Sequence, residues 1–312
     1  MERSMVEFSE IEKRILKETI DFYEIPEGAY NFRINGKSVA RKSTANIDVT
    51  LKPNGRGLEI RVKPGVKNES VHIPVVISAS GMKEVVENDF YIGKGAEVLI
   101  IAGCGIYNCG GESSRHDGIH RLYVEKGAHV KYVEKHFGFG ERLSKKDINP
   151  TTEVFAEPDS LVEMELEQLK GVSSTIRITS AELKDNAKLI IKERLFTHGR
   201  QTAESKIKAV LIGKDSTVDI SSRAVAQDYS IQNFSSNIIG EGKCRGHSEC
   251  DAIIMDHARV TALPSLTANS LDAELIHEAA IGKIAGEQIT KLMSLGLTRA
   301  EAESKIINGF LK

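Results

Sequence analysis

Two groups of residues in this sequence carry side chains that could bind a soft metal ion or carry sulfur. The first lies in GCGIYNCGGESSRHDGIH, where two thiols and two imidazoles fall within seventeen residues: Cys104, Cys109, His116 and His120. Thiolates and imidazoles are ligands of zinc and of iron–sulfur clusters. The Cys-x4-Cys and His-x3-His spacings are not those of a zinc finger, so a turn with incidental polar residues stays open as the alternative. The glycines around the thiols would allow a close approach.

The second group lies near the end of the chain, with Cys250 in HSECDAI and His277-Glu278 in LIHEAA. A thiolate, an imidazole and a carboxylate could hold a soft metal cluster together if the fold unites them. The gap of 278 − 250 = 28 residues is close to the repeat length described below, so stacking could superpose them. The alternative is a buried structural cysteine and a glutamate that caps a helix.

A third motif, Asn35-Gly36-Lys37-Ser38, is similar to the end of a phosphate-binding loop. The complete motif needs a glycine five residues before Gly36, and that residue is Asn31. We therefore interpret the motif as a turn, and we expect any nucleotide hydrolysis to belong to another chain.

An internal repeat predicts the scaffold that positions these residues. Each copy has a turn-forming residue, then Ala or Ser, one variable residue, and Val or Leu, as in Gly95-Ala96-Glu97-Val98. The copies start at residues 95, 127, 159, 186 and 215, which are 32, 32, 27 and 29 residues apart, and His257-Ala258-Arg259-Val260 is a possible last copy. Regularly spaced β-rich units indicate a β-solenoid. A β-sandwich is the alternative, although two-residue hairpin signals are few between the copies.

Helical patterns at the two ends complete the predicted organisation. We expect a helical segment over 1–43, a β-helix core over 44–272 and a helical region over 273–312. In the last region an apolar stripe runs from about Ala279 to Leu295, and Thr298 and Glu301 form a capping box for a second short helix. Helices at both ends would cover the ends of a solenoid, and the last region would offer a docking surface.

Composition excludes several classes of protein. The chain has 44 acidic and 42 basic residues and a formal charge of −2, which does not favour nucleic acid. It contains no apolar stretch of the roughly 18 residues that a membrane helix needs, and four cysteines do not suggest a disulfide framework. We expect a cytoplasmic protein with reduced thiols. Aromatic residues at 5% and no tryptophan argue against a β-helix enzyme acting on polysaccharide. A purely structural solenoid would leave the cysteines unexplained.

Several segments resemble the SufB/SufD family. The tail HEAAIGKIAGEQITKLMSLGLTRAEAESKIINGF is similar to the C-terminal signature of that family, and CDAIIMDHARVTALPSLTANSLDAELIHEA is similar to its Cys-Asp segment. AVAQDYSIQNFSSNIIGEG resembles the penultimate coils of the family, and AGCGIYNCGG with GIHRLYVEKGAHVKY resembles its cysteine-bearing coil. The resemblance covers roughly residues 60 to 312.

The resemblance implies a right-handed parallel β-helix that is a scaffold and not itself an enzyme. It implies that the C-terminal helical region binds the ABC-type ATPase SufC, and that nascent, transiently bound iron–sulfur clusters pass to apo-proteins. We expect a dimer through the last coils, either with a second copy or with a SufD-like paralogue.

Matched residue by residue, the resemblance implies a cluster site at the dimer interface made of Cys250, His277 and Glu278. It implies that Cys104 accepts or relays sulfur and that His120 is the histidine of the following strand. Two positions differ from the family pattern: His136 stands where the family has Gln, and VVISASGMKEVV lacks the Arg and Asn of SufB. Cys109 and His116 are outside that pattern and are possible additional ligands.

Overall fold

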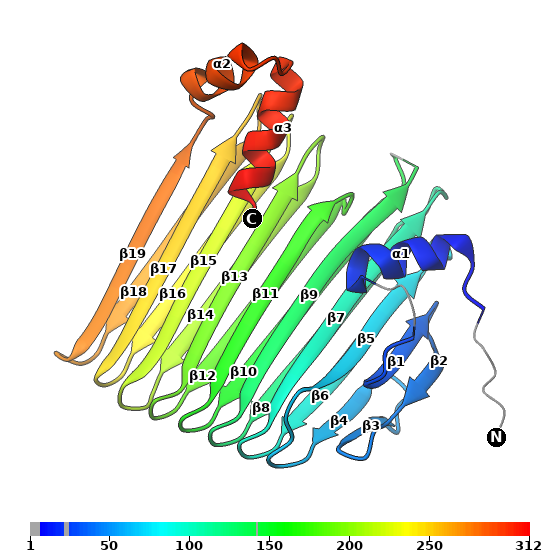
Figure 1. Cartoon of the computed structure of the whole chain (residues 1–312), viewed down its shortest axis with the longest axis vertical. Helices are drawn as coiled ribbons and strands as arrows, with labels where there is room; N and C mark the ends of the chain where they lie inside the picture. Colours follow the sequence, from blue (N-terminus) through cyan, green and yellow to red (C-terminus); the bar gives the residue numbers. More distant parts are fainter. Residues whose placement is uncertain (1–6, 22–24, 142) are drawn as a thin grey trace.

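The computed structural model describes residues 7–21, 25–141 and 143–312, and these form a parallel β-solenoid with helices near both ends (Figure 1). From β4 onward the chain gives one strand to each of two facing sheets in turn, whereas β1 and β2 both belong to one sheet and β3 and β4 to the other. Within the described residues one sheet has ten strands in the order β19-β17-β15-β13-β11-β9-β7-β5-β1-β2, and the other has nine in the order β18-β16-β14-β12-β10-β8-β6-β4-β3. The fold class predicted from the repeat is therefore confirmed.

The elements follow one another at short intervals. The helices are α1 (Glu10–Ile20), α2 (Gly286–Ser294) and α3 (Arg299–Phe310). The strands of the ten-stranded sheet are β1 (Ala29–Ile34), β2 (Lys37–Lys42), β5 (Glu69–Ile77), β7 (Glu97–Asn108), β9 (His129–Gly140), β11 (Leu161–Lys170), β13 (Lys188–Thr197), β15 (Ser216–Ala226), β17 (Cys244–Ile254) and β19 (Ala273–Gly282). Those of the nine-stranded sheet are β3 (Ile47–Leu51), β4 (Leu58–Val62), β6 (Lys83–Ile92), β8 (Ser114–Val124), β10 (Lys146–Ala156), β12 (Ser174–Leu183), β14 (Thr202–Leu211), β16 (Ile231–Gly240) and β18 (Arg259–Ala268).

The repeat marks one corner of the solenoid. The first residue of each copy has a positive φ, in the left-handed region that Gly, Asn and Asp tolerate best: Gly95, Gly127, Asp159, Asn186 and Asp215. The small residue that follows is buried in every copy, and a strand of the ten-stranded sheet starts one or two residues after the first residue of the copy. The suggested last copy lies elsewhere, because Asp256 and Ala258 precede β18 in the other sheet. Cys244 pairs with Ser216 on one side and Ala273 on the other, so it occupies the small-residue position of the corner before β17.

Alternate side chains of every strand fill the space between the two sheets. Near the strand end that follows the repeat corner this filling is apolar, with Val98, Val130 and Val162 in one row of paired positions. Further along the strands the inward residues include His, Glu, Arg and Ser side chains that are also buried. The interior therefore has an apolar part, which stabilises the fold by burial of apolar area, and a polar part that needs internal partners.

The boundaries of the terminal segments differ from those predicted. Residues 29–42, placed in an N-terminal helical segment, form the antiparallel hairpin β1–β2, whose turn is Asn35-Gly36 with positive φ at both residues. The turn interpretation of that motif is confirmed. Residues 273–282, placed in the C-terminal helical region, form β19, and helix begins only at Gly286. Pairing with β17 extends the sheet by a strand and overrides the apolar stripe that suggested helix from Ala279. Residues 1–6 and 22–24 of the first segment lie outside the described residues.

Helix α1 lies across the outer face of the ten-stranded sheet (Figure 1). It begins at a capping box formed by Ser9 and Glu12. It rests on Gly103 and Gly105, since a Cβ on Gly105 would lie 2.2 Å from the Ile15 side chain. These two glycines of β7 thus make room for the helix directly behind Cys104. None of the helices that the structure describes is long and apolar enough to cross a membrane.

Candidate functional site

The thiol of Cys104 lies inside the solenoid. Cys104 is on β7 and pairs with His136 of β9, and both side chains are buried. From the facing sheet, His116 and His120 of β8 project into the same region. These four side chains, with Glu134, line an internal cavity of about 20 Å³, which is large enough for one water molecule. The fold thus unites three of the first four candidate residues around one small polar cavity.

His120 is held at both ring nitrogens. Its Nδ1 lies 2.7 Å from the hydroxyl oxygen of Tyr132, and its Nε2 lies 3.2 Å from the side-chain amide of Asn88. The Tyr132 hydroxyl in turn donates a hydrogen bond to Glu134. Burial lowers the pKa of His120 to about 4, although the Glu134 carboxylate opposes that shift. His120 is therefore a neutral, fully engaged member of the polar interior.

Glu134 is the anion at the centre of this network. Its Oε1 lies 2.7 Å from the guanidinium of Arg177 and 3.0 Å from Nε2 of His136. Burial by itself would raise the pKa of Glu134, but the charge of Arg177 and the contact with His136 hold that pKa well below its usual value. Burial lowers the pKa of His136, while Glu134 acts against the shift. A buried ion pair with additional hydrogen bonds is thus built beside Cys104.

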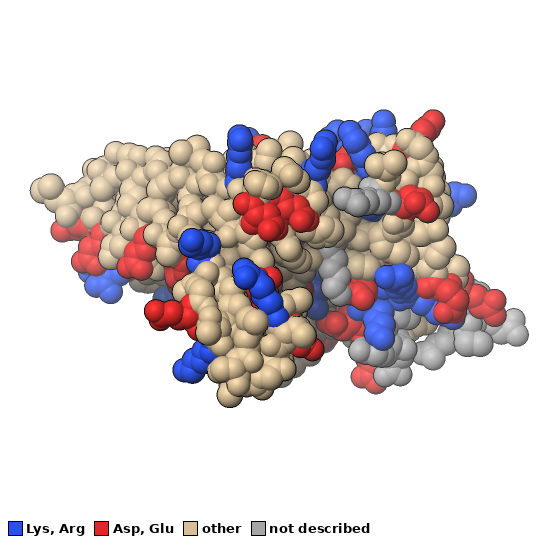
Figure 2. Space-filling model, turned by 90° about the horizontal axis from the view of Figure 1, so that it is seen from above, with Lys and Arg blue, Asp and Glu red and all other residues tan. Residues whose placement is uncertain are grey.

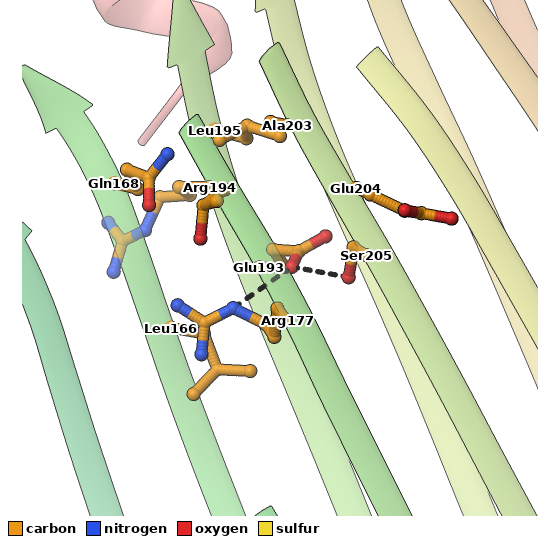
Figure 3. A pocket seen from close by; sticks show the side chains of 10 residues that line it. Leu166, Gln168, Arg177, Glu193, Arg194, Leu195, Ala203, Glu204 and Ser205 are labelled. Carbon is orange, nitrogen blue, oxygen red and sulfur yellow. Dashed lines mark hydrogen bonds and ion pairs between the residues drawn. The ribbon is translucent and has the colours of Figure 1, made fainter. Parts of the chain in front are cut away.

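A second, smaller group continues the polar interior along the solenoid. Figure 3 shows a cavity, of about 10 Å³, where the Arg177 side chain points toward Glu193 of β13. Arg177 Nε lies 3.5 Å from Glu193, which also accepts hydrogen bonds from Ser205 at 2.7 Å and Ser222 at 2.9 Å. Arg177 is therefore shared by two buried carboxylates, Glu134 on one side and Glu193 on the other.

His116 has a separate carboxylate partner. Its Nδ1 lies 3.4 Å from Glu84 Oε1, and among the described residues neither atom has a hydrogen-bond partner. Glu84 also pairs with Arg33 Nε at 3.1 Å. Burial alone would raise the pKa of Glu84, but His116 and Arg33 together hold that pKa below its usual value.

Cys109 is not part of this buried group. It is exposed in the turn after β7, whereas Cys104, His116 and His120 are buried. Within the ranges that the structure covers, no three His, Cys, Asp or Glu side chains are arranged to hold a metal ion. The four-ligand set suggested by GCGIYNCGGESSRHDGIH is thus divided between the surface and the interior, because Cys104 lies within β7 whereas Cys109 follows the last residue of that strand.

Cys250 lies inside the solenoid near its other end. The inward positions Glu134, Leu166, Glu193, Ser222 and Cys250 pair in succession across β9, β11, β13, β15 and β17, so they form a single interior row. Burial raises the pKa of the Cys250 thiol to about 12, with smaller contributions from the Glu193 and Asp251 carboxylates. The Cys250 thiol is therefore protonated and covered in this structure.

The structure brings His277 near Cys250 but directs Glu278 away from it. Cys250 pairs with Ala279 of β19, a separation of 29 residues, so the 28-residue gap places Glu278 opposite Glu249. Adjacent residues of a strand point to opposite faces, and a difference of one residue therefore reverses the side chain. His277 faces the interior beside Ser248, one inward position from Cys250, and Glu278 is exposed on the outer face.

The last coil leaves the end of the solenoid open. β18 and β19 each pair with a strand on one side only, and their side chains are largely exposed. Leu263 and Ile276 are 64% and 56% exposed, and Leu266 and Ile281 are also exposed. Figure 2 shows few charged side chains over this end of the molecule, at the left of the view. In the part of the chain that the structure describes, no further coil covers the inward-facing residues of the last coil.

The charged residues of the interior were not identified from the sequence. Glu84, Glu134, Arg177 and Glu193 were not singled out, although each is buried or carries a side chain exposed by no more than 6%. The sequence does contain a signal that Glu134 points inward. Val130, Tyr132, Glu134 and His136 are at alternate positions of one strand, so their side chains point to the same face of the sheet. Because Val130 is apolar, that face of the sheet is expected to be the inward one.

Comparison with known proteins gives one consistent family. A family model described as the SufBD core domain of the SUF system for FeS cluster assembly matches residues 76–310. An iron–sulfur cluster assembly SufBD family protein of Archaeoglobus fulgidus is 31% identical over 261 residues, which are 82% of this chain and 68% of the relative.

Two further archaeal relatives carry the same family description. That of Methanothermobacter thermautotrophicus is 28% identical over 82% of this chain and 62% of its own length. That of Pyrococcus horikoshii is 28% identical over 83% of this chain and 78% of its own length. The chain thus spans less than two thirds of the Methanothermobacter relative.

Proposed function

The chain belongs to the SufBD family of iron–sulfur cluster assembly proteins, and on this premise we propose that it is a scaffold on which nascent clusters form before transfer to apo-proteins. The cluster is cargo in this proposal. A SufC-like ABC-type ATPase would supply the energy, in a separate chain.

The observation that carries the proposal is the position of Cys250. Its thiol and the His277 imidazole face the interior from the last two strands of one sheet, at the open end of the solenoid. A thiolate can hold persulfide sulfur and then bind iron, while imidazole and carboxylate ligands bind a cluster weakly enough for release. Glu278 lies on the strand next to Cys250 but on the outer face, so it would join the site only after a change of geometry.

We infer that β19 is the strand that moves. It covers Cys250, it carries His277 and Glu278, and it continues directly into α2 and α3. An ATPase bound to those two helices would pull on β19 when its own subunits dimerise. Separation of β19 from β17 would expose the Cys250 thiol to water, which would favour the thiolate because burial is the main cause of its raised pKa.

The open end is also where we propose that a second copy, or a SufD-like paralogue, docks. The unpaired edges of β18 and β19 and the exposed Leu263 and Ile276 are the kind of surface that a stable protein covers. Two copies meeting there would place two Cys250 residues near one interface.

Cys104 is proposed as the residue that accepts sulfur. The polar interior residues between Cys104 and Cys250, among them Glu134, Arg177 and Glu193, would form the environment through which sulfur reaches the last coil. His120 would take part as a neutral hydrogen-bonding group of that environment.

Replacement of Cys250 by Ala tests the proposal, with Cys244→Ala as the matched control. Cys244 lies on the same strand and is also buried, but it occupies the small-residue position of the repeat corner. After anaerobic reconstitution with iron and sulfide, we expect Cys250→Ala to lose bound iron and sulfide, and Cys244→Ala to keep them. Equal iron and sulfide content in the two variants would exclude Cys250 as a cluster ligand. Co-purification with an ABC-type ATPase tests the partner.

A further inference from the structure

One buried histidine beside Cys104 keeps a ring nitrogen available. The two nitrogens of His120 contact Tyr132 and Asn88, and those of His136 contact Glu134 and Arg177. His116 differs, since its Nδ1 lies 3.4 Å from Glu84 without a hydrogen bond, while its ring lines the same cavity as Cys104. The Nε2 atom of His116 is the one that a side chain at Gly118 would approach, at 3.2 Å, on the cavity wall.

The proximity of the Glu84 carboxylate favours one placement of the proton on His116. A carboxylate next to Nδ1 favours the tautomer with the proton on Nδ1, which leaves Nε2 as a hydrogen-bond acceptor. Arg33 holds Glu84 from its other oxygen, and all three side chains are buried or nearly so. A histidine that lies beside a carboxylate and lines the same cavity as a thiol is suited to activate a cysteine nucleophile.

We propose that Glu84 and His116 form a buried relay that removes the proton from Cys104 when this cysteine accepts sulfur. The inference rests on the proposed role of Cys104 as sulfur acceptor and adds the residues that activate it. No direct contact between the thiol and the imidazole is needed in the resting state, because the cavity between them can hold one water molecule and a base can act through one water.

The reaction is a sulfur transfer from a persulfide donor. His116 Nε2 takes the proton of the Cys104 thiol, directly or through water, and Glu84 stabilises the imidazolium that results. The Cys104 thiolate attacks the outer sulfur of the donor persulfide, a new S–S bond forms, and the S–S bond of the donor breaks. The electron pair of that bond leaves on the donor thiolate, which takes up the proton, so no external oxidant or reductant is consumed.

The surroundings of Cys104 explain why a base is needed. Burial raises the pKa of the Cys104 thiol well above its usual value, and the Glu84 and Glu134 carboxylates raise it further. The titratable and charged groups around the cavity come from β1, β6, β8, β9 and β12, and they are Arg33, Glu84, His116, His120, Glu134, His136 and Arg177. Arg33 and Arg177 are each already paired with a carboxylate, so neither is placed to stabilise a Cys104 thiolate.

The test uses the full chain with Cys104 as its single cysteine, made by Cys109→Ser, Cys244→Ala and Cys250→Ser. Methyl methanethiosulfonate is the probe, because a thiolate attacks its sulfur and displaces methanesulfinate in the same kind of S–S bond formation. The rate is followed by mass spectrometry over roughly pH 5 to pH 9, where imidazoles titrate. The variants are His116→Gln and, as a matched control, His129→Gln, which removes the histidine of a partly exposed His–Glu pair with a 2.7 Å contact to Glu163.

We expect the parent rate to show an inflection in the imidazole range, and His116→Gln to lose it and to react about a hundredfold more slowly at neutral pH. His129→Gln should match the parent. Equal rates in His116→Gln and the parent, or an equal loss in His129→Gln, would overturn the relay. If His116→Gln does not fold, the parent profile decides: a steady rise with pH and no inflection also overturns it.

Iron and sulfide reconstitution separates this inference from the proposed function. Free sulfide bypasses sulfur delivery, so His116→Gln in the chain with all four cysteines should retain a cluster. Retained cluster with an unchanged reaction at Cys104 would refute the relay alone. Absence of any retained cluster in the unmodified chain would refute the scaffold, while the reaction at Cys104 would still report on the relay.

Discussion

Replacement of Arg177 by Met should strongly destabilise the middle of the solenoid. The Arg177 side chain is 5% exposed, and its two carboxylate partners, Glu134 and Glu193, are 4% and 5% exposed. Methionine keeps much of the volume but removes the one cation that both carboxylates share. Breaking a buried ion pair by deleting one partner costs about 3–5 kcal/mol, because the remaining charge is left in an apolar surrounding.

The pH dependence of this loss follows from Glu134. Its pKa in the folded protein is well below the usual value, so its contribution to stability is present above the unfolded pKa and is lost as the pH falls through the folded pKa. Without Arg177 the pKa of Glu134 must rise, since the charge of Arg177 is the largest influence that lowers it. The deficit of Arg177→Met should therefore be greatest at neutral pH and should shrink as the pH falls and Glu134 becomes protonated.

The assay is urea unfolding followed by circular dichroism, with amide hydrogen exchange of β9 to β13 to detect local opening. Exchange is needed because solenoids can unfold in part, so a single transition does not report every coil. Arg194→Met is the matched control, since its contact with Glu165 is 3.8 Å long and partly exposed, and such pairs contribute about 1 kcal/mol or less. The reasoning is refuted if Arg177→Met costs no more than the control at neutral pH, or if its deficit grows on acidification.

Two other predictions concern α1 and His120. Gly105→Ala should release α1 from the sheet, because the new Cβ would lie 2.2 Å from the Ile15 side chain. Faster amide hydrogen exchange and faster proteolysis over residues 10–20 would show this release. Gly111→Ala is the control and should have no effect, because nothing lies within 4 Å of a Cβ at that position. The pKa of His120 is about 4 in the folded protein, against 6.5 for the free side chain. Between these two pH values the unfolded state therefore binds more protons than the folded state. The free energy of unfolding should fall by up to about 3 kcal/mol as the pH drops through that window. His120→Asn should weaken this acid sensitivity, and an unchanged pH dependence of the unfolding midpoint would contradict the assignment.

The repeat was sufficient to predict the solenoid because each copy encodes one corner in local terms. Asp159, Asn186 and Asp215 adopt the left-handed backbone that their short polar side chains tolerate, and the Ala or Ser that follows fits where the corner is narrow. Local patterns were less decisive at the ends. The stripe that includes Ile281 satisfies a helical period, but pairing of β19 with β17 determines the outcome there.

The site was harder to predict, because it depends on which coil lies beside which. Cys104, His116 and His120 were identified by residue type, and stacking does unite them. Glu84, which contacts His116, is 32 residues earlier in the chain, and its partner Arg33 comes from the N-terminal hairpin. Such partners cannot be paired from the sequence without the register of each coil.

The strand register at the last coil also determines which of Cys250, His277 and Glu278 share a face of the sheet. A coil of 29 residues places His277 on the interior face with Cys250 and places Glu278 outside. If the three proposed ligands met inside the closed coil, the bound cluster would be covered and its release would be slow. His277 and Glu278 lie on opposite faces of β19, so both could reach Cys250 only if that strand twists or leaves the sheet. In the proposed scaffold, this division would allow a partner bound to α2 and α3 to control assembly and release.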